Sequence, residues 1–242
     1  MSQPYTVSFP LDMCAVDFTG RWQPGAVFRA MQEASSAHCA SLHASYQELH
    51  ALGLAWVLTR ASLEMERYPT LGQTVTVSTW PTETRHAFFP RHYTFALDGE
   101  EIGRATALYV LLDIETRKIA TPARLTVPIP VCPRPAPLPM PGNLTALEAP
   151  VRSASYTPVY TDLDMNGHVN NTRYVDWFMN QFPLEKHKRE ELARLLIHYH
   201  FEVRPEEPLR LELQEQGSLA AFHGISGDRP CFMLEGEWRA KP

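Results

Sequence analysis

The chain has 242 residues and a formal net charge of −5, with 44% apolar and 20% charged residues. This composition is ordinary for a globular protein with a buried core, and it excludes a disordered, collagen-like or fibrous chain. The mild acidity argues against a dedicated nucleic-acid-binding protein, which needs a basic surface. The length fits one large domain or two small ones.

The cysteines are scattered and form no CxxC pair, so the sequence predicts neither a zinc site nor a disulfide framework. They are Cys14, Cys39, Cys132 and Cys231. The first residues show no basic start followed by an apolar run, and the longest apolar stretches, near 51–58 and 107–112, are too short to span a bilayer. We therefore expect a soluble cytoplasmic protein without a membrane span.

Proline is unusually frequent, and seven of the 14 residues from Pro128 to Pro141 are proline. Proline has no amide hydrogen and fixes its own backbone angle, so this run cannot be a helix or a central strand. We interpret residues 128–150 as an extended, semi-rigid linker rather than as a proline-rich docking motif.

Residues 1–127 predict a short strand, a long helix and four strands in a meander. The helix is expected from about Pro24 to Leu52, because apolar and small residues recur there at three- and four-residue spacing before Gly53. The strands are expected at 56–66, 74–80, 88–97 and 104–116, with a turn at Asp98-Gly99.

Residues 151–242 repeat the same order of elements. We expect a short strand at 154–160, helical segments at about 171–182 and 184–195, and strands at 196–204, 209–216, 219–225 and 231–238. Two halves with matching order suggest duplication of one α+β unit. Two such α+β units, each an antiparallel sheet wrapped around a helix, resemble a tandem, or double, hotdog fold.

Polar side chains gather between the short strand and the first helix of the second half. Asp164, Asn166 and His168 alternate along the chain, which places them on one side of an extended segment. Gly167 permits a tight turn among them. A polar loop would not require this alternation or a histidine before a helix, so the pattern favours a catalytic loop.

The start of the following helix adds two expectations. Asn170 or Asn171 can cap the helix. The amides near Val169 and Asn170 are candidates for holding a negative charge that develops on a reacting oxygen.

The stretch Asp162-Leu-Asp-Met-Asn-Gly-His-Val-Asn-Asn171-x-x-Tyr174 resembles the signature of acyl-ACP thioesterases, the plant and bacterial enzymes that end fatty-acid synthesis. Gly53–Leu58 and Phe88–Arg91 are also similar to the family, and the order of elements matches it over nearly the whole chain. The resemblance implies a tandem hotdog in which the proline-rich stretch connects two domains, 1–127 and 151–242.

The resemblance assigns catalytic roles to Asp164, Asn166, His168 and Glu202, the last of which ends the segment Ile197-His-Tyr-His-Phe-Glu202. Some relatives have a cysteine after this glutamate. Here Val203 occupies that position, so a papain-like thiolate is not expected. His168 and Glu202 are expected to share proton transfer. Asn166 would orient the thioester or the water. Asp164 is either an electrostatic partner or a nucleophile, and both mechanisms stay open.

The implied reaction is hydrolysis of fatty acyl-ACP to a free fatty acid and the carrier thiol, without cofactor or metal. An acyl-CoA thioesterase and a non-catalytic acyl-binding hotdog protein remain alternatives. The histidines match no metal-ligand spacing. We expect the first half to supply the acyl pocket, with its helix and residues near Trp56, Leu58 and Phe88 as candidates. The alternative for each of these residues is ordinary core packing.

Carrier recognition by an acidic chain requires a local basic patch, because acyl carrier protein is itself acidic. The candidates are Arg85, Arg91, Arg117, Lys118 and the run Lys186-His-Lys-Arg189, which could equally be a solvated helix face. The sequence leaves a homodimer open.

Overall fold

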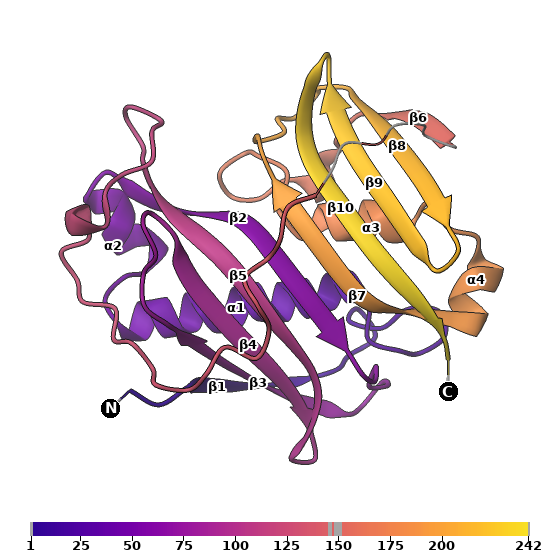
Figure 1. The fold of residues 1–242 in the computed structure, drawn as a ribbon, viewed down its shortest axis with the longest axis horizontal. Coiled ribbons are helices and arrows are strands. Elements are labelled where there is room, and N and C mark those ends of the chain that lie inside the picture. Colours follow the sequence, from indigo (N-terminus) through magenta and orange to yellow (C-terminus); the bar gives the residue numbers. More distant parts are fainter. Residues whose placement is uncertain (1, 145–146, 148–151, 242) are drawn as a thin grey trace. The chain divides into compact units, whose positions relative to one another are not determined.

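The computed structural model describes residues 2–144, 147 and 152–241. The chain divides into two compact units, Met1–Pro141 and Gly142–Pro242 (Figure 1). In the part of the chain that is described, no helix is long and apolar enough to cross a membrane. The predicted boundaries of the linker, 128–150, stay a prediction, and residues 145–146 and 148–150 of it lie outside the described residues.

Unit 1 combines one long helix, one short helix, a 3-10 turn and antiparallel strands. Its elements are β1 (Tyr5–Pro10), α1 (Pro24–Ser41), α2 (Tyr46–Ala51), β2 (Leu54–Met65), β3 (Thr74–Pro81), β4 (Phe89–Leu97), β5 (Glu100–Asp113) and the 3-10 turn η1 (Pro122–Arg124). The strand order is β1-β3-β4-β5-β2. Helix α1 packs on β1 and β3, and it buries Val27, Met31 and Ala34. The stripe of small residues lets the helix lie close to the sheet.

The predicted four-strand meander is wrong at its first strand. Only β3, β4 and β5 follow one another in space, whereas β2 pairs with β5 and not with β3. Asp98 and Gly99 make the tight turn between β4 and β5 with positive φ angles of 52° and 85°. The alternation of polar and apolar residues identifies each strand but cannot say which neighbour it pairs with.

The long helix predicted over 24–52 is broken between Ser41 and Tyr46. His43 has a φ of 57°, which ends the helical path. Ser45 then caps α2, because its hydroxyl accepts from the amide of Glu48 and the Glu48 carboxylate accepts from the amide of Ser45. This Ser-x-x-Glu capping box was visible in the sequence and marks a second helix start.

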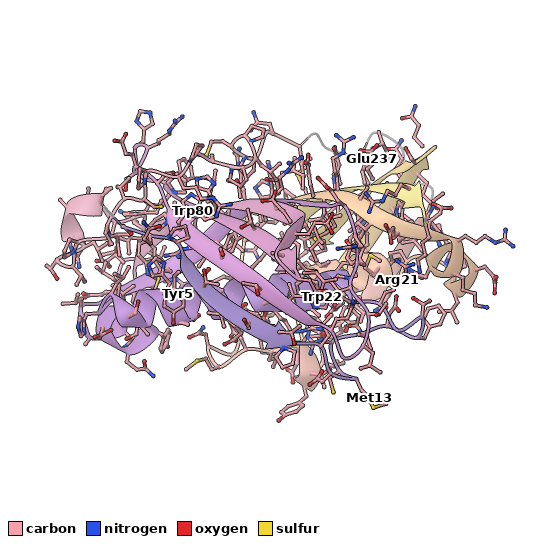
Figure 2. The ribbon with its side chains drawn as sticks, turned by 90° about the horizontal axis from the view of Figure 1, so that it is seen from below. Tyr5, Met13, Arg21, Trp22, Trp80 and Glu237 are labelled. Carbon is pink, nitrogen blue, oxygen red and sulfur yellow. The ribbon has the colours of Figure 1, made fainter. Side chains whose placement is uncertain are left out.

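Within unit 1, the proline-rich residues 128–141 pack on the sheet. The guanidinium of Arg134 lies 4.3 Å from the centroid of Trp80, whose indole N–H donates to the Arg134 carbonyl at 3.1 Å. Trp80 lies near the end of β3 and is labelled in Figure 2. The Cys132 amide donates to Pro81 at 3.1 Å. Residues 128–141 contain neither helix nor strand.

Unit 2 has the same topology as unit 1. Its elements are β6 (Arg152–Tyr156), the 3-10 turn η2 (Tyr160–Asp162), α3 (Arg173–Met179), α4 (Leu184–Arg189), β7 (Glu190–Tyr199), β8 (Leu209–Gln216), β9 (Leu219–Ser226) and β10 (Arg229–Ala240). The strand order β6-β8-β9-β10-β7 corresponds strand by strand to the order in unit 1. The shared topology supports duplication more strongly than element order alone.

The helix predicted over 184–195 is wrong beyond Arg189. Residues Glu190–Tyr199 form β7, which pairs with β10. The leucines, alanine and glutamates at the start of this strand favour a helix intrinsically, but pairing with β10 buries Leu192, Leu195 and Ile197. The gain from tertiary packing therefore outweighs local helix propensity.

Helix α3 packs through aromatic rings onto the sheet of unit 2. The ring of Tyr174 lies 4.6 Å from that of Phe232, and Phe178 lies 5.9 Å from Phe222. A side chain at Gly236 would collide with the Phe178 ring, so glycine permits this close approach. This packing fixes the helix that follows the predicted catalytic loop.

Candidate active site

The loop between η2 and α3 is closed by its own backbone. The Asp164 amide donates to the His168 carbonyl at 2.8 Å, and the Gly167 amide donates to the Asp164 carbonyl at 3.0 Å. Gly167 has a φ of 72°, a conformation that glycine adopts without strain. The loop is therefore a defined turn with Asp164 and His168 at its base.

Asp164 organises this turn through its carboxylate. Its Oδ1 atom accepts from the amides of Asn166 (2.8 Å) and His168 (3.3 Å), and its Oδ2 atom accepts from the Asn166 side chain at 3.3 Å. The carboxylate thus fixes the backbone at Asn166 and His168, the other two predicted residues of the loop. Asn166 is exposed, while Asp164 and His168 are half-buried.

His168 and Glu202 come together from segments far apart in the sequence. Nε2 of His168 lies 3.5 Å from Oε2 of Glu202, and both side chains are about one-third exposed, at 28% and 35%. The carboxylate can orient the imidazole, and solvent or a substrate can reach both groups. The pair has the composition of a general acid–base site.

Glu202 is placed by the segment between β7 and β8. The amides of His200 and Phe201 donate to the carbonyl of Cys231 at 2.9 and 3.1 Å. On the other side of Glu202, the carbonyl of Val203 accepts from the Val169 amide at 3.0 Å. Backbone bonds to β10 and to the loop therefore hold Glu202 beside His168.

The predicted oxyanion donors are not available. The Val169 amide donates to Val203, and the Asn170 amide donates to the Asp162 carbonyl at 2.8 Å. The first bond joins the loop to the segment after Glu202, and the second joins the two ends of the loop. Both amides are therefore already engaged, and the prediction that they would hold a developing negative charge is corrected. Asn170, rather than Asn171, stabilises the residues just before α3. Its side-chain oxygen accepts hydrogen bonds from the Thr172 amide and hydroxyl, each at 2.9 Å.

Cys231 is a neighbour of the site that the sequence did not reveal. It lies on β10, and its carbonyl binds the two residues that precede Glu202. Its side chain is 1% exposed, and burial raises the pKa of the thiol. A buried, protonated thiol is a poor nucleophile. The separation in sequence hides this proximity, which only the β7–β10 pairing creates.

Arg91 cannot belong to a basic patch on the surface. It is 6% exposed, and its guanidinium contacts Nδ1 of His38 at 2.9 Å, Oγ1 of Thr79 at 3.4 Å and Sγ of Cys39 at 3.4 Å. On α4, Lys188 pairs with Glu185 and Lys186 with Glu190, which reduces the local positive charge. Arg85, Arg117 and Lys118 are exposed.

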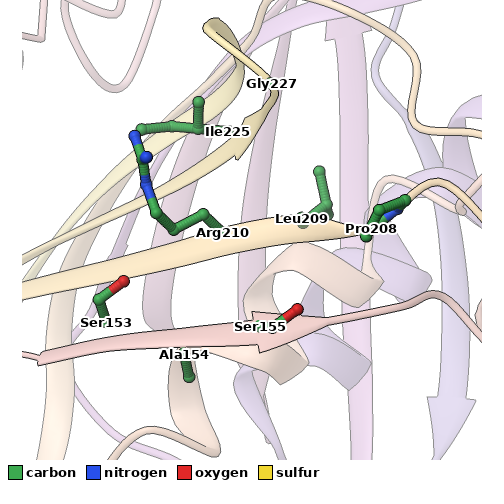
Figure 3. A pocket seen from close by; sticks show the side chains of 8 residues that line it. All are labelled: Ser153, Ala154, Ser155, Pro208, Leu209, Arg210, Ile225 and Gly227. Atoms are coloured by element: carbon green, nitrogen blue, oxygen red, sulfur yellow. The ribbon is translucent and has the colours of Figure 1, made fainter.

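A pocket of about 420 Å³ in unit 2 does not contain the predicted catalytic residues. It is lined by Ser153, Ala154, Ser155, Pro208, Leu209, Arg210, Ile225 and Gly227 (Figure 3). Its one charged side chain, Arg210, is paired with Glu212 at 2.9 Å. Among the described residues, no group of three or more His, Cys, Asp or Glu side chains could hold a metal ion.

Two domains of one protein family match most of the chain. Residues 2–124 match the acyl-ACP thioesterase N-terminal domain, and residues 147–234 match the acyl-ACP thioesterase C-terminal domain. Two units of the same topology, each with antiparallel strands packed on a helix, define a tandem hotdog protein, as predicted. The chain belongs to the acyl-ACP thioesterase family, and the resemblance noted in the sequence is confirmed.

Curated relatives include plant enzymes. The chain is 31% identical over 87% of its length to an acyl-[acyl-carrier-protein] hydrolase of Cuphea viscosissima, and 28% identical over 89% of its length to a dodecanoyl-[acyl-carrier-protein] hydrolase of Cinnamomum camphora. The matches span 56% and 62% of these relatives' own lengths.

Solved structures share the fold over nearly the whole chain. An acyl-ACP thioesterase from Bacteroides thetaiotaomicron aligns with a TM-score of 0.89 at 24% identity, covering 97% of each chain. A 12:0-ACP thioesterase from Umbellularia californica aligns with a TM-score of 0.84 at 25% identity, covering 98% of each chain.

Proposed function

We propose that this protein hydrolyses the thioester of fatty acyl-ACP, releasing a free fatty acid and so terminating fatty-acid synthesis. The observation that carries the proposal is the His168–Glu202 pair at 3.5 Å, held at a turn that Asp164 organises. Membership of the acyl-ACP thioesterase family supports the choice of substrate. The plant relatives named above are described as hydrolases of such substrates.

In the proposed mechanism, water is the nucleophile. The His168–Glu202 pair accepts a proton as the water oxygen bonds to the thioester carbon. The carbon–sulfur bond then breaks, and the proton passes to the departing sulfur. Asn166 is exposed at the turn, where its second side-chain N–H can donate to the thioester oxygen or to the water.

The contacts of Asp164 favour general-base chemistry over attack by this carboxylate. Both of its oxygens already accept hydrogen bonds from Asn166 or His168. Attack on the carbonyl would weaken these bonds and loosen the turn. We therefore assign Asp164 an electrostatic and organising role and leave the nucleophilic step to water.

Parallel assays test the proposal. The intact protein is offered the same acyl chain on ACP and on CoA, and free thiol is detected in each reaction. Faster release from ACP supports the proposal. Faster release from CoA would identify an acyl-CoA thioesterase instead. Acyl binding without thiol release from either carrier would identify a non-catalytic acyl-binding protein.

A further inference from the structure

Asp162 is a buried carboxylate immediately before the catalytic loop. It is 5% exposed and ends the turn η2. Its Oδ2 atom accepts from the Tyr156 hydroxyl at 2.6 Å and from the Val159 amide at 2.9 Å. Its Oδ1 atom accepts from the indole N–H of Trp177 at 3.2 Å. The side chain therefore joins the end of β6, the turn before the loop, and helix α3.

The backbone of Asp162 closes the loop at the same place. Its carbonyl accepts from the Asn170 amide at 2.8 Å, and Leu163 and Val169 form an antiparallel bridge. The two ends of the segment that carries Asp164 and His168 thus meet at Asp162. Asp162 thus joins the two ends of the loop, and Asp164 stabilises the turn within it.

All three donors to the Asp162 side chain are neutral groups, and no ion pair with it is found among the described residues. Burial, together with the hydrogen bond to Asp162, raises the pKa of Tyr156 to about 12, so this hydroxyl keeps its proton. A carboxylate can accept hydrogen bonds on both oxygens. Asparagine at this position has an NH₂ group in place of one of the two oxygens. That NH₂ group would face an N–H donor, either of Val159 or of Trp177, and a hydrogen bond would be lost.

We propose that Asp162 is a positioning residue for catalysis, which fixes the loop so that His168 stays in register with Glu202. The inference rests on the proposed hydrolysis, because it assigns Asp162 a role in that reaction. The link runs through the backbone: Asp162 holds Asn170, and the adjacent Val169 amide holds Val203, the residue after Glu202. Loosening the base of the loop would shift His168 relative to Glu202.

The test compares Asp162→Asn with two variants that retain the carboxylate, Tyr156→Phe and Trp177→Phe. Each of these removes one donor. The control is Asp17→Asn in unit 1, where a carboxylate holds a turn by accepting from the Thr19 amide (2.8 Å), the Thr19 hydroxyl (2.7 Å) and the Arg21 amide (3.2 Å). Folded fraction is measured for every variant, and kinetic constants are expressed per folded molecule.

We expect Asp162→Asn to lower kcat for acyl-ACP by about 100-fold with little change in KM, because misplacement of a reacting group affects the chemical step. Tyr156→Phe and Trp177→Phe should each lower kcat by about tenfold. Asp17→Asn should leave kcat unchanged. Wild-type kcat in folded Asp162→Asn and Tyr156→Phe, or an equal loss in Asp17→Asn, would overturn the proposal.

A second readout does not depend on activity. Glu202→Gln is introduced into the wild type and into Asp162→Asn, and the ring resonances of His168 are followed by NMR. The proposal predicts that Glu202→Gln shifts these resonances in the wild type but far less in the Asp162→Asn background. Equal shifts would overturn it. If Asp162→Asn does not fold, Tyr156→Phe replaces it in this comparison. If the wild type releases no thiol, the proposed function is refuted. The NMR comparison would still test whether Asp162 positions His168 relative to Glu202.

Discussion

The Val169 amide donates to the Val203 carbonyl at 3.0 Å, so the residue after His168 is bonded to the residue after Glu202. This one backbone contact joins the two segments that carry the proposed proton-transfer pair. The side chains can then meet at 3.5 Å although both remain partly exposed. The site therefore relies on backbone bonds for its geometry, which leaves the functional groups free to face a substrate.

Cysteine chemistry should be dispensable. We expect Cys231→Ala to retain a wild-type kcat, because its thiol is buried and contacts the Arg229 carbonyl at 3.6 Å rather than a catalytic group. Some loss of stability is expected, since the substitution leaves a small cavity. Steady-state assays together with thermal unfolding separate the two effects. Complete inactivation by a thiol-blocking reagent, traced to Cys231, would refute a mechanism without cysteine.

Carrier recognition should depend on salt. The kcat/KM value for acyl-ACP should fall as salt rises, because surface attraction is screened within about 8–10 Å at physiological ionic strength. A short acyl thioester without a protein carrier should show little change. Charge reversal at Arg85, Arg117 or Lys118, which are all exposed, should reduce kcat/KM for acyl-ACP only. An equal response of both substrates to salt and to all three reversals would exclude recognition of the carrier protein.

Arg91 is unsuitable for that series because it is buried. Charge reversal there would bury a carboxylate beside His38, Thr79 and Cys39 in place of the guanidinium. A loss of activity in such a variant would report unfolding and not carrier recognition.

The free energy of unfolding should decrease as the pH is lowered from 6.5 to 4. Burial lowers the pKa of His38, His92 and His223 to about 4, from the ordinary value of 6.5, and the charge of Arg91 adds to the effect at His38 and His92. In that window the unfolded chain binds protons that the folded chain does not, so acid favours unfolding. Each histidine should reduce the free energy of unfolding by about 1–2 kcal/mol at pH 5 relative to pH 7.

Urea unfolding at pH 7 and pH 5 measures this loss. The ring nitrogens of His92 contact the hydroxyls of Thr82 and Thr106 at 3.0 and 2.9 Å, which suits a neutral imidazole. His92→Gln should therefore show a smaller difference between the two pH values than the wild type. His50→Ala, at an exposed position, serves as the control and should show the full difference. Identical differences in all three proteins would contradict the assignment.

The sequence predicted the elements better than their connections. Strand β8 occurs over the predicted residues 209–216, because alternation of side chains is a local property. The helix predicted over 184–195 ended at Arg189, since pairing with β10 is a non-local effect. The break before Ser45 could have been predicted from its capping box.

At the candidate site, too, the sequence predicted which residues are near one another along the chain but not the contacts between distant segments. Alternation of Asp164, Asn166 and His168 predicted an extended segment, but these residues lie in a tight turn instead. The Asp164 carboxylate organises that turn. The sequence could not reveal that the Val169 amide is already bonded, or that Cys231 binds the two residues before Glu202. Both facts depend on where distant strands place their backbones. The catalytic roles of the four residues stay predictions.

The most direct test of the account is a double-mutant cycle on His168 and Glu202, measured as kcat/KM for acyl-ACP. Removing a general acid or base should lower activity by about 100- to 10,000-fold, and groups that act as one unit lose activity together. We predict that His168→Ala, Glu202→Gln and the double variant stay folded and show nearly the same loss. Near-wild-type activity in folded His168→Ala, or losses that multiply in the double variant, would contradict a shared proton-transfer role for the pair.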